Sequence, residues 1–428
     1  MLGPARAATP REVRGGDRAR SSRTRRSAYR VLMYSHDSFG LGHLRRCRAI
    51  AHALVERHKK LNVLILSGSP LIGRFSFRAR VDFVRVPGII KLRSGEYTSL
   101  NLHVNIEETL ALRASIIRHT ALAFDPHLFL VDKEPLGLLG EVRKTLRMLK
   151  RRGHCRLVLG LRDIMDEPLV VAEEWQRKNV MPALEELYDH IWVYGHPQIY
   201  DPITAYQFPP KVAAKTSFTG YLRRAPQPNA YLPHEVAAIL EKDLHLLVTP
   251  GGGGDGAELV NAVISAYEQF DDRLPWSALV VYGPFLPNRL REEFEQRAAQ
   301  LPRVTTLTFH EHLENLMEKA TAVLSLGGYN TFSEILSLNK RSIIVPRVTP
   351  RVEQLLRAEA AEKLGLAQML SPERLTPETL TDAILRLPEQ PPPATQKIPG
   401  LLQGLQRINA AVAQWRRELK AEGSNRRP

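Results

Sequence analysis

The sequence is poor in cysteine and lacks long apolar runs. Cys47 and Cys155 are the two cysteines in 428 residues, which excludes a disulfide framework and favours a reducing cytoplasm. No apolar stretch approaches the ~18 residues that a membrane-spanning helix requires. Residues 1–28 show no apolar core of a secretory signal. We therefore expect a cytoplasmic protein, with a peripheral location at the inner membrane face left open.

Motifs of metal and nucleic-acid chemistry are missing as well. His310-Glu311-His312 lacks the i, i+4 histidine spacing of a zinc-binding helix. The sequence has no P-loop, no G-x-S-x-G nucleophile elbow and no basic recognition helix. We therefore predict no metal ion, no bound cofactor and no nucleic-acid partner.

Positive charge gathers at the N-terminus. The chain carries 60 Lys and Arg against 45 Asp and Glu, a net charge of +15. Eight arginines give residues 1–28 a charge of +6 and leave +9 for the remainder. The first 28 residues show no apolar periodicity, which predicts a disordered tail. Contact of this tail with an anionic membrane stays open, and the remaining surplus suits a protein with phosphorylated ligands.

Short apolar runs alternate with amphipathic helical segments along the rest of the chain. Such alternation predicts α/β domains with doubly wound parallel sheets, and the length favours two Rossmann-like domains facing a central cleft. The expected divisions are a tail at 1–28, an N-terminal domain at 29–222, a linker at 223–243, a C-terminal domain at 244–390, and a linker with a terminal helix at 391–428.

The first glycine-bearing loop joins the first strand to the first helix. It reads Gly40-Leu41-Gly42-His43, and its glycines permit a close approach of the backbone to a ligand. Histidine is the side chain best suited to accept a proton from a hydroxyl near neutral pH. His43 is therefore the candidate catalytic base, against the alternative of local packing or capping.

A second glycine loop follows the first strand of the C-terminal domain. Gly251, Gly252, Gly253 and Gly254 precede Asp255-Gly256, which formally satisfies the dinucleotide pattern G-x-G-x-x-G. The ribose-binding acid expected at the end of the next strand is absent, because that strand ends in Tyr282-Gly283-Pro284. We interpret the loop as a diphosphate cradle, and an NAD-dependent oxidoreductase remains a lesser alternative.

The stretch Ala322–Arg347 reads as strand, glycine turn, helix and strand. The helix start suits a phosphate, because its first N–H groups are free and lie at the positive end of the helix dipole. Thr331-x-x-Glu334 is also the pattern of a capping box, which would make Glu334 structural. We favour Glu334 as a ligand-binding residue, with Asn330 or Thr331 capping the helix. The candidates here are Gly327, Gly328, Asn330, Thr331 and Glu334.

Polar residues mark two further strand ends. Arg347 and the pair Glu353-Gln354 follow the next strand, where they could bind phosphate and hydroxyl groups. Asp132 and Glu134 follow a buried strand of the N-terminal domain. Together with the irregular segment 89–105, that edge is expected to bind the second substrate.

These segments resemble a known family. Gly327–Glu334 followed by Pro346–Gln354 is similar to the C-terminal domain of glycosyltransferase family 28, a bacterial family with the two-domain GT-B fold. The resemblance implies that Glu334 holds the ribose hydroxyls of a UDP-sugar donor and that Glu353-Gln354 lie near the donor sugar. It also implies that His43 is the general base and that both glycine loops, through residues such as Gly40 and Gly42, face the diphosphate.

The expected function is metal-independent, inverting transfer of a sugar from a nucleotide-diphosphate donor to a small-molecule, polysaccharide or lipid-linked acceptor. Gly40–Cys47 also resembles a UDP-sugar hydrolase in which the equivalent histidine activates water, so hydrolysis remains an alternative. Gly160–Asp163 and Phe218–Tyr221 resemble segments of uncharacterised bacterial predicted glycosyltransferases. No role follows from these two segments at this point.

Overall fold

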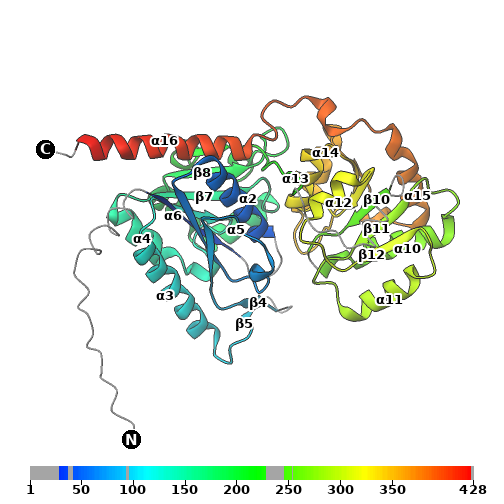
Figure 1. The fold of residues 1–428 in the computed structure, drawn as a ribbon, viewed down its shortest axis with the longest axis horizontal. Coiled ribbons are helices and arrows are strands. Elements are labelled where there is room, and N and C mark those ends of the chain that lie inside the picture. Colours follow the sequence, from blue (N-terminus) through cyan, green and yellow to red (C-terminus); the bar gives the residue numbers. More distant parts are fainter. Residues whose placement is uncertain (1–27, 37–41, 93–95, 228–244, 253, 426–428) are drawn as a thin grey trace, which may run out of the picture.

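Two parallel β-sheets, each covered by helices, form the two halves of the molecule (Figure 1). The computed structural model describes residues 28–36, 42–92, 96–227, 245–252 and 254–425. Residues 1–27 of the expected tail therefore lie outside the described residues, as do Gly40 and Gly253. The arrangement confirms the predicted pair of doubly wound domains.

The N-terminal sheet has seven strands in the order β3-β2-β1-β6-β7-β8-β9. Its strands are β1 (Tyr29–Ser35), β2 (Leu61–Ser67), β3 (Val81–Arg85), β6 (Leu128–Asp132), β7 (Arg156–Arg162), β8 (His190–Tyr194) and β9 (Thr216–Phe218). Its helices are α2 (Gly42–Arg57), α3 (Ile106–Phe124), α4 (Arg143–Arg152), α5 (Pro168–Arg177), α6 (Val180–Leu187), α7 (Pro202–Ala205) and α8 (Pro210–Ala213). The central strands are apolar runs because helices bury both faces of the sheet.

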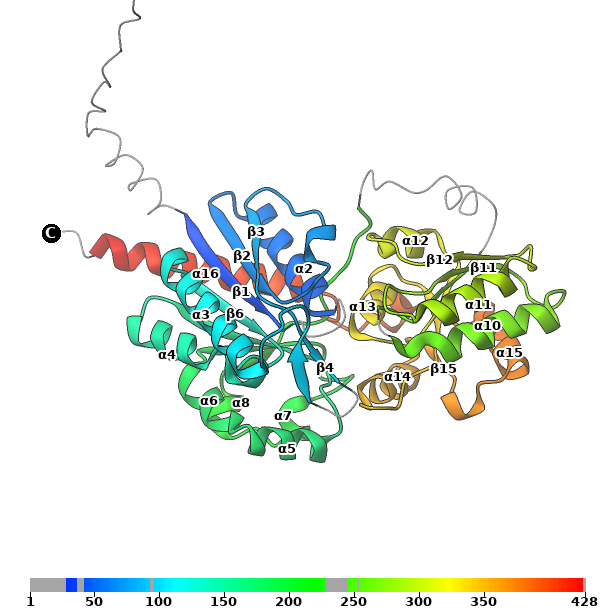
Figure 2. The ribbon, with the colours of Figure 1, turned by 90° about the horizontal axis from the view of Figure 1, so that it is seen from below.

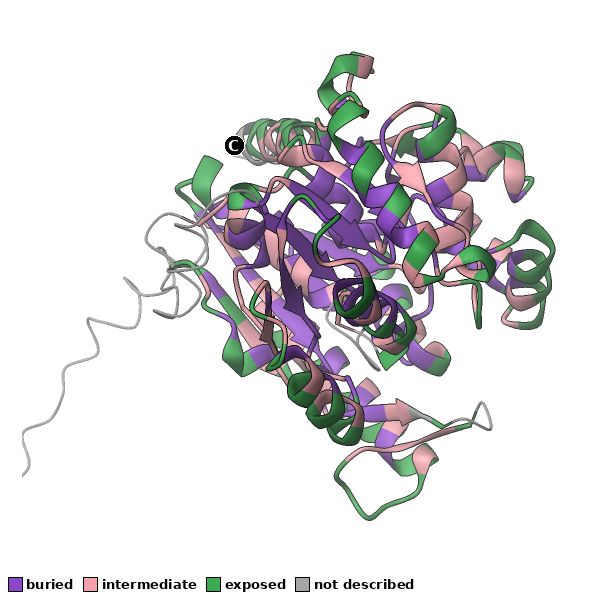
Figure 3. Ribbon diagram, turned by 90° about the vertical axis from the view of Figure 1, so that its right-hand side faces the viewer, coloured by how far each residue is buried: buried purple, intermediate pink, exposed green. Residues whose placement is uncertain are grey.

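The C-terminal sheet has six strands in the order β12-β11-β10-β13-β14-β15. Its strands are β10 (His245–Thr249), β11 (Ser277–Val281), β12 (Val304–Leu307), β13 (Ala322–Ser325), β14 (Arg341–Ile344) and β15 (Gln368–Met369). Its helices are α10 (Ala257–Phe270), α11 (Asn288–Ala298), α12 (Leu313–Lys319), α13 (Tyr329–Ser337), α14 (Glu353–Lys363) and α15 (Pro377–Arg386). Figure 3 shows buried strands at the centre and exposed outer faces on the helices.

Part of the segment expected to be irregular pairs with itself. β4 (Ile89–Lys91) and β5 (Tyr97–Ser99) form an antiparallel ribbon beside the start of α3. No clear alternation of apolar and polar residues marks these short strands, because the ribbon has too few residues to show a period of two. Within the described residues, no helix has the length and apolar character needed to cross a membrane.

The chain crosses between the domains twice, and the two crossings touch. The terminal helix α16 (Gly404–Asn425) returns to the N-terminal domain (Figures 1 and 2), where Trp415 stacks on Trp192 of β8 at 5.6 Å between ring centroids. At the crossing, the Tyr221 N–H donates to the Leu401 carbonyl at 2.7 Å. Gly220 has φ +85°, and a Cβ there would lie 2.3 Å from the Gly400 carbonyl oxygen. The close approach of the two segments therefore requires glycine at position 220.

A buried ion pair joins the domains beside this crossing. Arg357 of α14 donates from Nε and Nη2 to the two carboxylate oxygens of Asp163, each at 2.7 Å, and both side chains are 0% exposed. The Tyr221 hydroxyl donates to the same carboxylate at 2.7 Å. Arg357 Nη1 also donates to the Gly327 carbonyl at 3.0 Å. The segments Gly160–Asp163 and Phe218–Tyr221 thus meet in one cluster at the domain junction.

Asp163→Asn should lower the free energy of unfolding by about 3–5 kcal/mol, because the amide leaves Arg357 buried without its counter-charge. Asp382→Asn is the matched control, since Asp382 pairs with Arg273 where the side chains are 56% and 49% exposed. Exposed pairs of this kind contribute at most about 1 kcal/mol. Denaturant unfolding followed by circular dichroism measures the free energy of unfolding of both variants. Equal small losses of this free energy would contradict the importance of the buried pair.

Candidate functional site

A cavity of about 230 Å³ lies between the two domains. Its N-terminal wall comes from α2 and the end of β7, and its C-terminal wall comes from the segments that follow β10, β11, β12 and β13. These are carboxyl ends of parallel strands, where open α/β sheets bind ligands. The lining includes the predicted residues Gly42, His43, Gly251, Gly252, Gly328, Asn330, Thr331, Glu353 and Gln354.

His43 is held by a buried carboxylate. Its Nδ1 lies 2.6 Å from Oδ2 of Asp132, at the end of β6. Because a carboxylate accepts, Nδ1 carries the proton and Nε2 keeps its lone pair. Arg46, three residues further along α2, donates to both oxygens of Asp132 at 2.9 and 2.6 Å. Asp132, predicted at the acceptor edge, thus orients the candidate base.

Burial and mutual contacts set the charges of His43, Arg46 and Asp132. Burial would raise the pKa of Asp132, but Arg46 and His43 bring it well below its ordinary value, so the carboxylate is ionised. Burial lowers the pKa of His43 to about 4, and the opposing contribution of Asp132 does not restore it. At neutral pH the imidazole is therefore neutral, and its Nε2 is able to accept a proton.

The glycine loop after β10 packs against the end of β11. Gly251 has φ +91° and Gly283 has φ +89°. A Cβ on Gly283 would lie 2.1 Å from the Gly251 carbonyl oxygen, so only glycine permits this contact. Gly251 and Gly252 line the cavity, whereas Gly254 belongs to a short 3₁₀ turn that lines a neighbouring cavity with Arg347.

The start of α13 faces the cavity. Its N-cap is Gly328, and no side chain caps it, so the first-turn N–H groups are available to a ligand. The predicted cap by Asn330 or Thr331 was wrong, because Asn330 bridges the domains instead. Its Nδ2 donates to the Gly42 carbonyl at 3.0 Å, and its Oδ1 accepts from Arg224 at 3.0 Å.

Glu334 is buried one turn further along α13. Its Oε1 accepts from Arg45 of the N-terminal domain at 2.6 Å, and its Oε2 is buried without a hydrogen-bond partner among the described residues. It lines a second cavity of about 160 Å³, and Arg45 lines both cavities. Burial raises the pKa of Glu334. For this carboxylate to bind a ribose in the larger cavity, Arg45 has to move aside.

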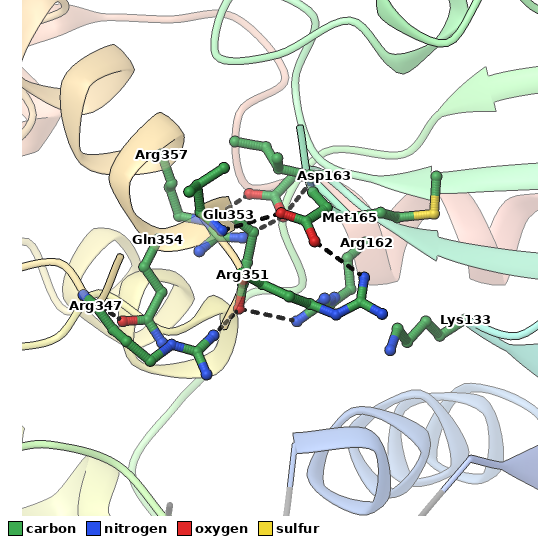
Figure 4. Close-up of polar contacts among 12 residues, drawn as sticks. Lys133, Arg162, Asp163, Met165, Arg347, Arg351, Glu353, Gln354 and Arg357 are labelled. Carbon is green, nitrogen blue, oxygen red and sulfur yellow. Dashed lines mark hydrogen bonds and ion pairs between the residues drawn. The ribbon is translucent and has the colours of Figure 1, made fainter. Parts of the chain in front are cut away.

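The pair Glu353-Gln354 is fixed by Arg347 (Figure 4). Arg347 Nη2 donates to Glu353 Oε1 at 2.6 Å, and its backbone N–H donates to Gln354 Oε1 at 3.1 Å. Arg347 also contacts Asp255 at 3.1 Å and does not line the interdomain cavity. Glu353 Oε2 stays buried without a partner in the part of the chain that the structure describes. The predicted phosphate ligand Arg347 thus holds neighbouring side chains.

Several cavity residues were not predicted from the sequence: Arg45, Arg46, Arg162, Phe309 and His310. The sequence contained a signal for Arg46, because a spacing of three residues places it on the same helical face as His43. The sequence also contained a signal for Arg162, because this residue ends a buried strand.

Glu134, predicted at the acceptor edge, pairs with Lys178 at 3.1 Å. Among the described residues, no group of three His, Cys, Asp or Glu side chains is arranged to hold a metal ion.

Comparison with known proteins identifies relatives of part of the chain and of its fold. Residues 245–409 match the model of the glycosyltransferase family 28 C-terminal domain. The UDP-N-acetylglucosamine–N-acetylmuramyl-(pentapeptide) pyrophosphoryl-undecaprenol N-acetylglucosamine transferase of Streptococcus uberis is 32% identical over 135 residues, which cover 31% of this chain and 35% of that enzyme. The chain spans between 22% and 38% of the length of such curated relatives.

Solved structures match nearly the whole chain at low sequence identity. MurG of Acinetobacter baumannii superposes with a TM-score of 0.55 at 12% identity, covering 90% of this chain and 99% of that one. A putative UDP-N-acetylglucosamine 2-epimerase from Listeria monocytogenes gives a TM-score of 0.58 at 12% identity, covering 94% and 98%. The chain therefore has the two-domain GT-B fold, and its residues 245–409 are similar to the glycosyltransferase family 28 C-terminal domain.

Proposed function

We propose that this protein is a glycosyltransferase that moves a sugar from a nucleotide-diphosphate donor, UDP-linked, to an acceptor hydroxyl. The observation that carries the proposal is the placement of His43, oriented by Asp132, in the same cavity as the uncapped start of α13. A base and an anion-binding helix end on opposite walls are what a single displacement at an anomeric carbon needs. The family 28 domain supports the donor class.

In this mechanism, Nε2 of His43 accepts the proton of the acceptor hydroxyl as its oxygen attacks the anomeric carbon. The bond from that carbon to the diphosphate oxygen breaks, and one in-line displacement inverts the anomeric centre. Asp132 stabilises the imidazolium that forms, as Arg46 keeps the carboxylate ionised. The leaving diphosphate gains its charge beside the N–H groups of α13 and the Gly251-Gly252 loop, without a metal ion.

Glu334 and Glu353 are the proposed hydroxyl ligands of the donor. Each has one buried carboxylate oxygen without a hydrogen-bond partner among the described residues, and such atoms are costly until a donor reaches them. Glu334 would bind the ribose after Arg45 moves, and Glu353 the transferred sugar. The acceptor, cytoplasmic location and contact with an anionic membrane remain predictions from the sequence.

Hydrolysis of the nucleotide sugar is the second candidate. His43, Arg46 and Cys47 share the segment that resembles a UDP-sugar hydrolase, and the same oriented imidazole activates water equally well. Incubation with UDP-sugars without acceptor separates the two reactions. Rapid stoichiometric release of free sugar favours the hydrolase, whereas product that forms only with an added acceptor favours the transferase.

His43→Ala should lower turnover of the UDP-sugar by about 10²–10⁴-fold, because it removes the proton acceptor. The affinity for UDP should stay unchanged, since the donor contacts lie on the other domain. His52→Ala is the matched control, because His52 lies on the same helix and outside the cavity. Coupled assay of UDP release and calorimetry of UDP binding measure these effects. Full turnover in His43→Ala would remove the residue from the mechanism.

The pH profile should also report the buried base. Burial lowers the pKa of His43 to about 4, so the base stays unprotonated as the pH falls through the ordinary histidine range. The acid limb of kcat/KM for the UDP-sugar should therefore have its midpoint near pH 4. A midpoint near the ordinary histidine pKa of about 6.5 would show that His43 is not buried as described or is not the base.

A further inference from the structure

A cluster of cations and carboxylates lies at the ends of β6 and β7 and the start of α14 (Figure 4). Two of its cations each contact two carboxylates. Lys178 contacts Glu134 at 3.1 Å and Glu174 at 2.5 Å. Arg351 contacts Glu174 at 3.1 Å and Asp166 at 3.4 Å. These two cations neutralise much of the surrounding negative charge.

Arg162 is an exception in this cluster. It lines the interdomain cavity with a side chain that is 15% exposed. The nearest carboxylate oxygen, Oε1 of Glu353, lies 3.9 Å away, beyond hydrogen-bond distance, and is already bound by Arg347. Its Nε is buried without a hydrogen-bond partner in the described part of the chain. Arg162 is therefore a guanidinium with a buried, unfilled Nε donor and one long ion pair among the described residues.

Lys133 is the second exception. Its side chain is 15% exposed, and its nearest anionic atom is an oxygen of Glu134 at 3.5 Å. The backbone takes φ +67°, which is uncommon for a residue other than glycine. The Lys133 N–H donates to the Gly160 carbonyl at 2.7 Å and fixes this turn. Burial, with the nearby Arg162 and Arg351, lowers the pKa of the ammonium to about 8.

The two cations occupy neighbouring strand ends beside the candidate base. Asp132 of β6 pairs in register with Gly160 of β7, so Lys133 and Arg162 extend from the same edge of the sheet. Asp132, directly before Lys133, holds His43. Each of the two cations has one long carboxylate contact, at 3.9 Å for Arg162 and 3.5 Å for Lys133. Buried cations with such weak pairing are costly, and an anionic group between them would offer acceptors to both.

We propose that Lys133 and Arg162 form a subsite for an anionic group of the acceptor, a phosphate or a carboxylate. This inference rests on the proposed glycosyl transfer, because it assigns the N-terminal wall to the acceptor. The donor diphosphate has its own contacts on the C-terminal domain, at α13 and Gly251-Gly252. Lys133 is not among the residues that line the cavity facing those contacts. Because Lys133 directly follows Asp132, which holds His43, we assign the anion to the molecule that brings its hydroxyl to this base.

The test is calorimetric titration of the UDP-saturated protein with inorganic phosphate and, in a parallel experiment, with acetate. The wild-type protein should bind at least one of these anions. The titration that shows a heat of binding tells whether the subsite takes a phosphate or a carboxylate. The double variant Lys133→Gln/Arg162→Gln should bind that anion at least about 10-fold more weakly, because charge-assisted hydrogen bonds are lost. The affinity for UDP should be unchanged.

Lys178→Gln is the matched control, because it removes a cation of the same cluster that already has two carboxylate partners. It should retain anion binding. The proposal is overturned if neither anion binds the wild-type protein, if the double variant binds as tightly as the wild type, or if the double variant loses UDP affinity in parallel. Absence of UDP binding to the wild type would instead refute the proposed function, and titration without UDP would still decide whether the anion subsite exists.

Discussion

The buried pair between Asp163 and Arg357 is the interaction on which the rest of the site depends. It joins the end of β7 to α14, and Arg357 also holds the Gly327 carbonyl directly before the start of α13. Buried ion pairs often add little net stability, but removal of one partner is strongly unfavourable. The pair therefore acts as a geometric constraint, because it fixes one domain against the other and sets the turn proposed to bind the diphosphate.

A second contact couples His43 to the start of α13. Arg46 binds Asp132 on one side and lies over the ring of Tyr329, the first residue of α13, at 5.1 Å from the centroid on the other. A cation over an aromatic face is attracted to it. Since Tyr221 stacks on the same ring at 5.7 Å, the crossing, the base and the helix start share one packed unit. Movement of either domain would therefore disturb both His43 and the start of α13.

The sequence was sufficient for the central strands and most of the helices, but it missed the short strands β4 and β5. Apolar runs identified the strands, glycines marked Gly251–Gly252 and Gly327–Gly328, and a loop histidine pointed to His43. It was not sufficient for pairings across long separations. Asp132 lies 89 residues from His43, and Asp163 lies 194 residues from Arg357, so both contacts depend on how strands and domains pack. The side-chain cap on α13 was predicted wrongly because Asn330 bonds to the opposite domain, a partner that local patterns cannot reveal.

The central claim is that the interdomain cavity binds a nucleotide diphosphate at its glycine loops, and calorimetry with UDP tests it directly. Gly283→Ala and Gly140→Ala form a matched pair, because both glycines have φ near +89° but only a Cβ at Gly283 meets the Gly251 carbonyl oxygen, at 2.1 Å. The wild-type protein and Gly140→Ala should bind UDP with equal affinity, and Gly283→Ala at least about 10-fold more weakly, because its loop is displaced. No UDP binding to the wild type, or equal binding to all three proteins, would contradict the account.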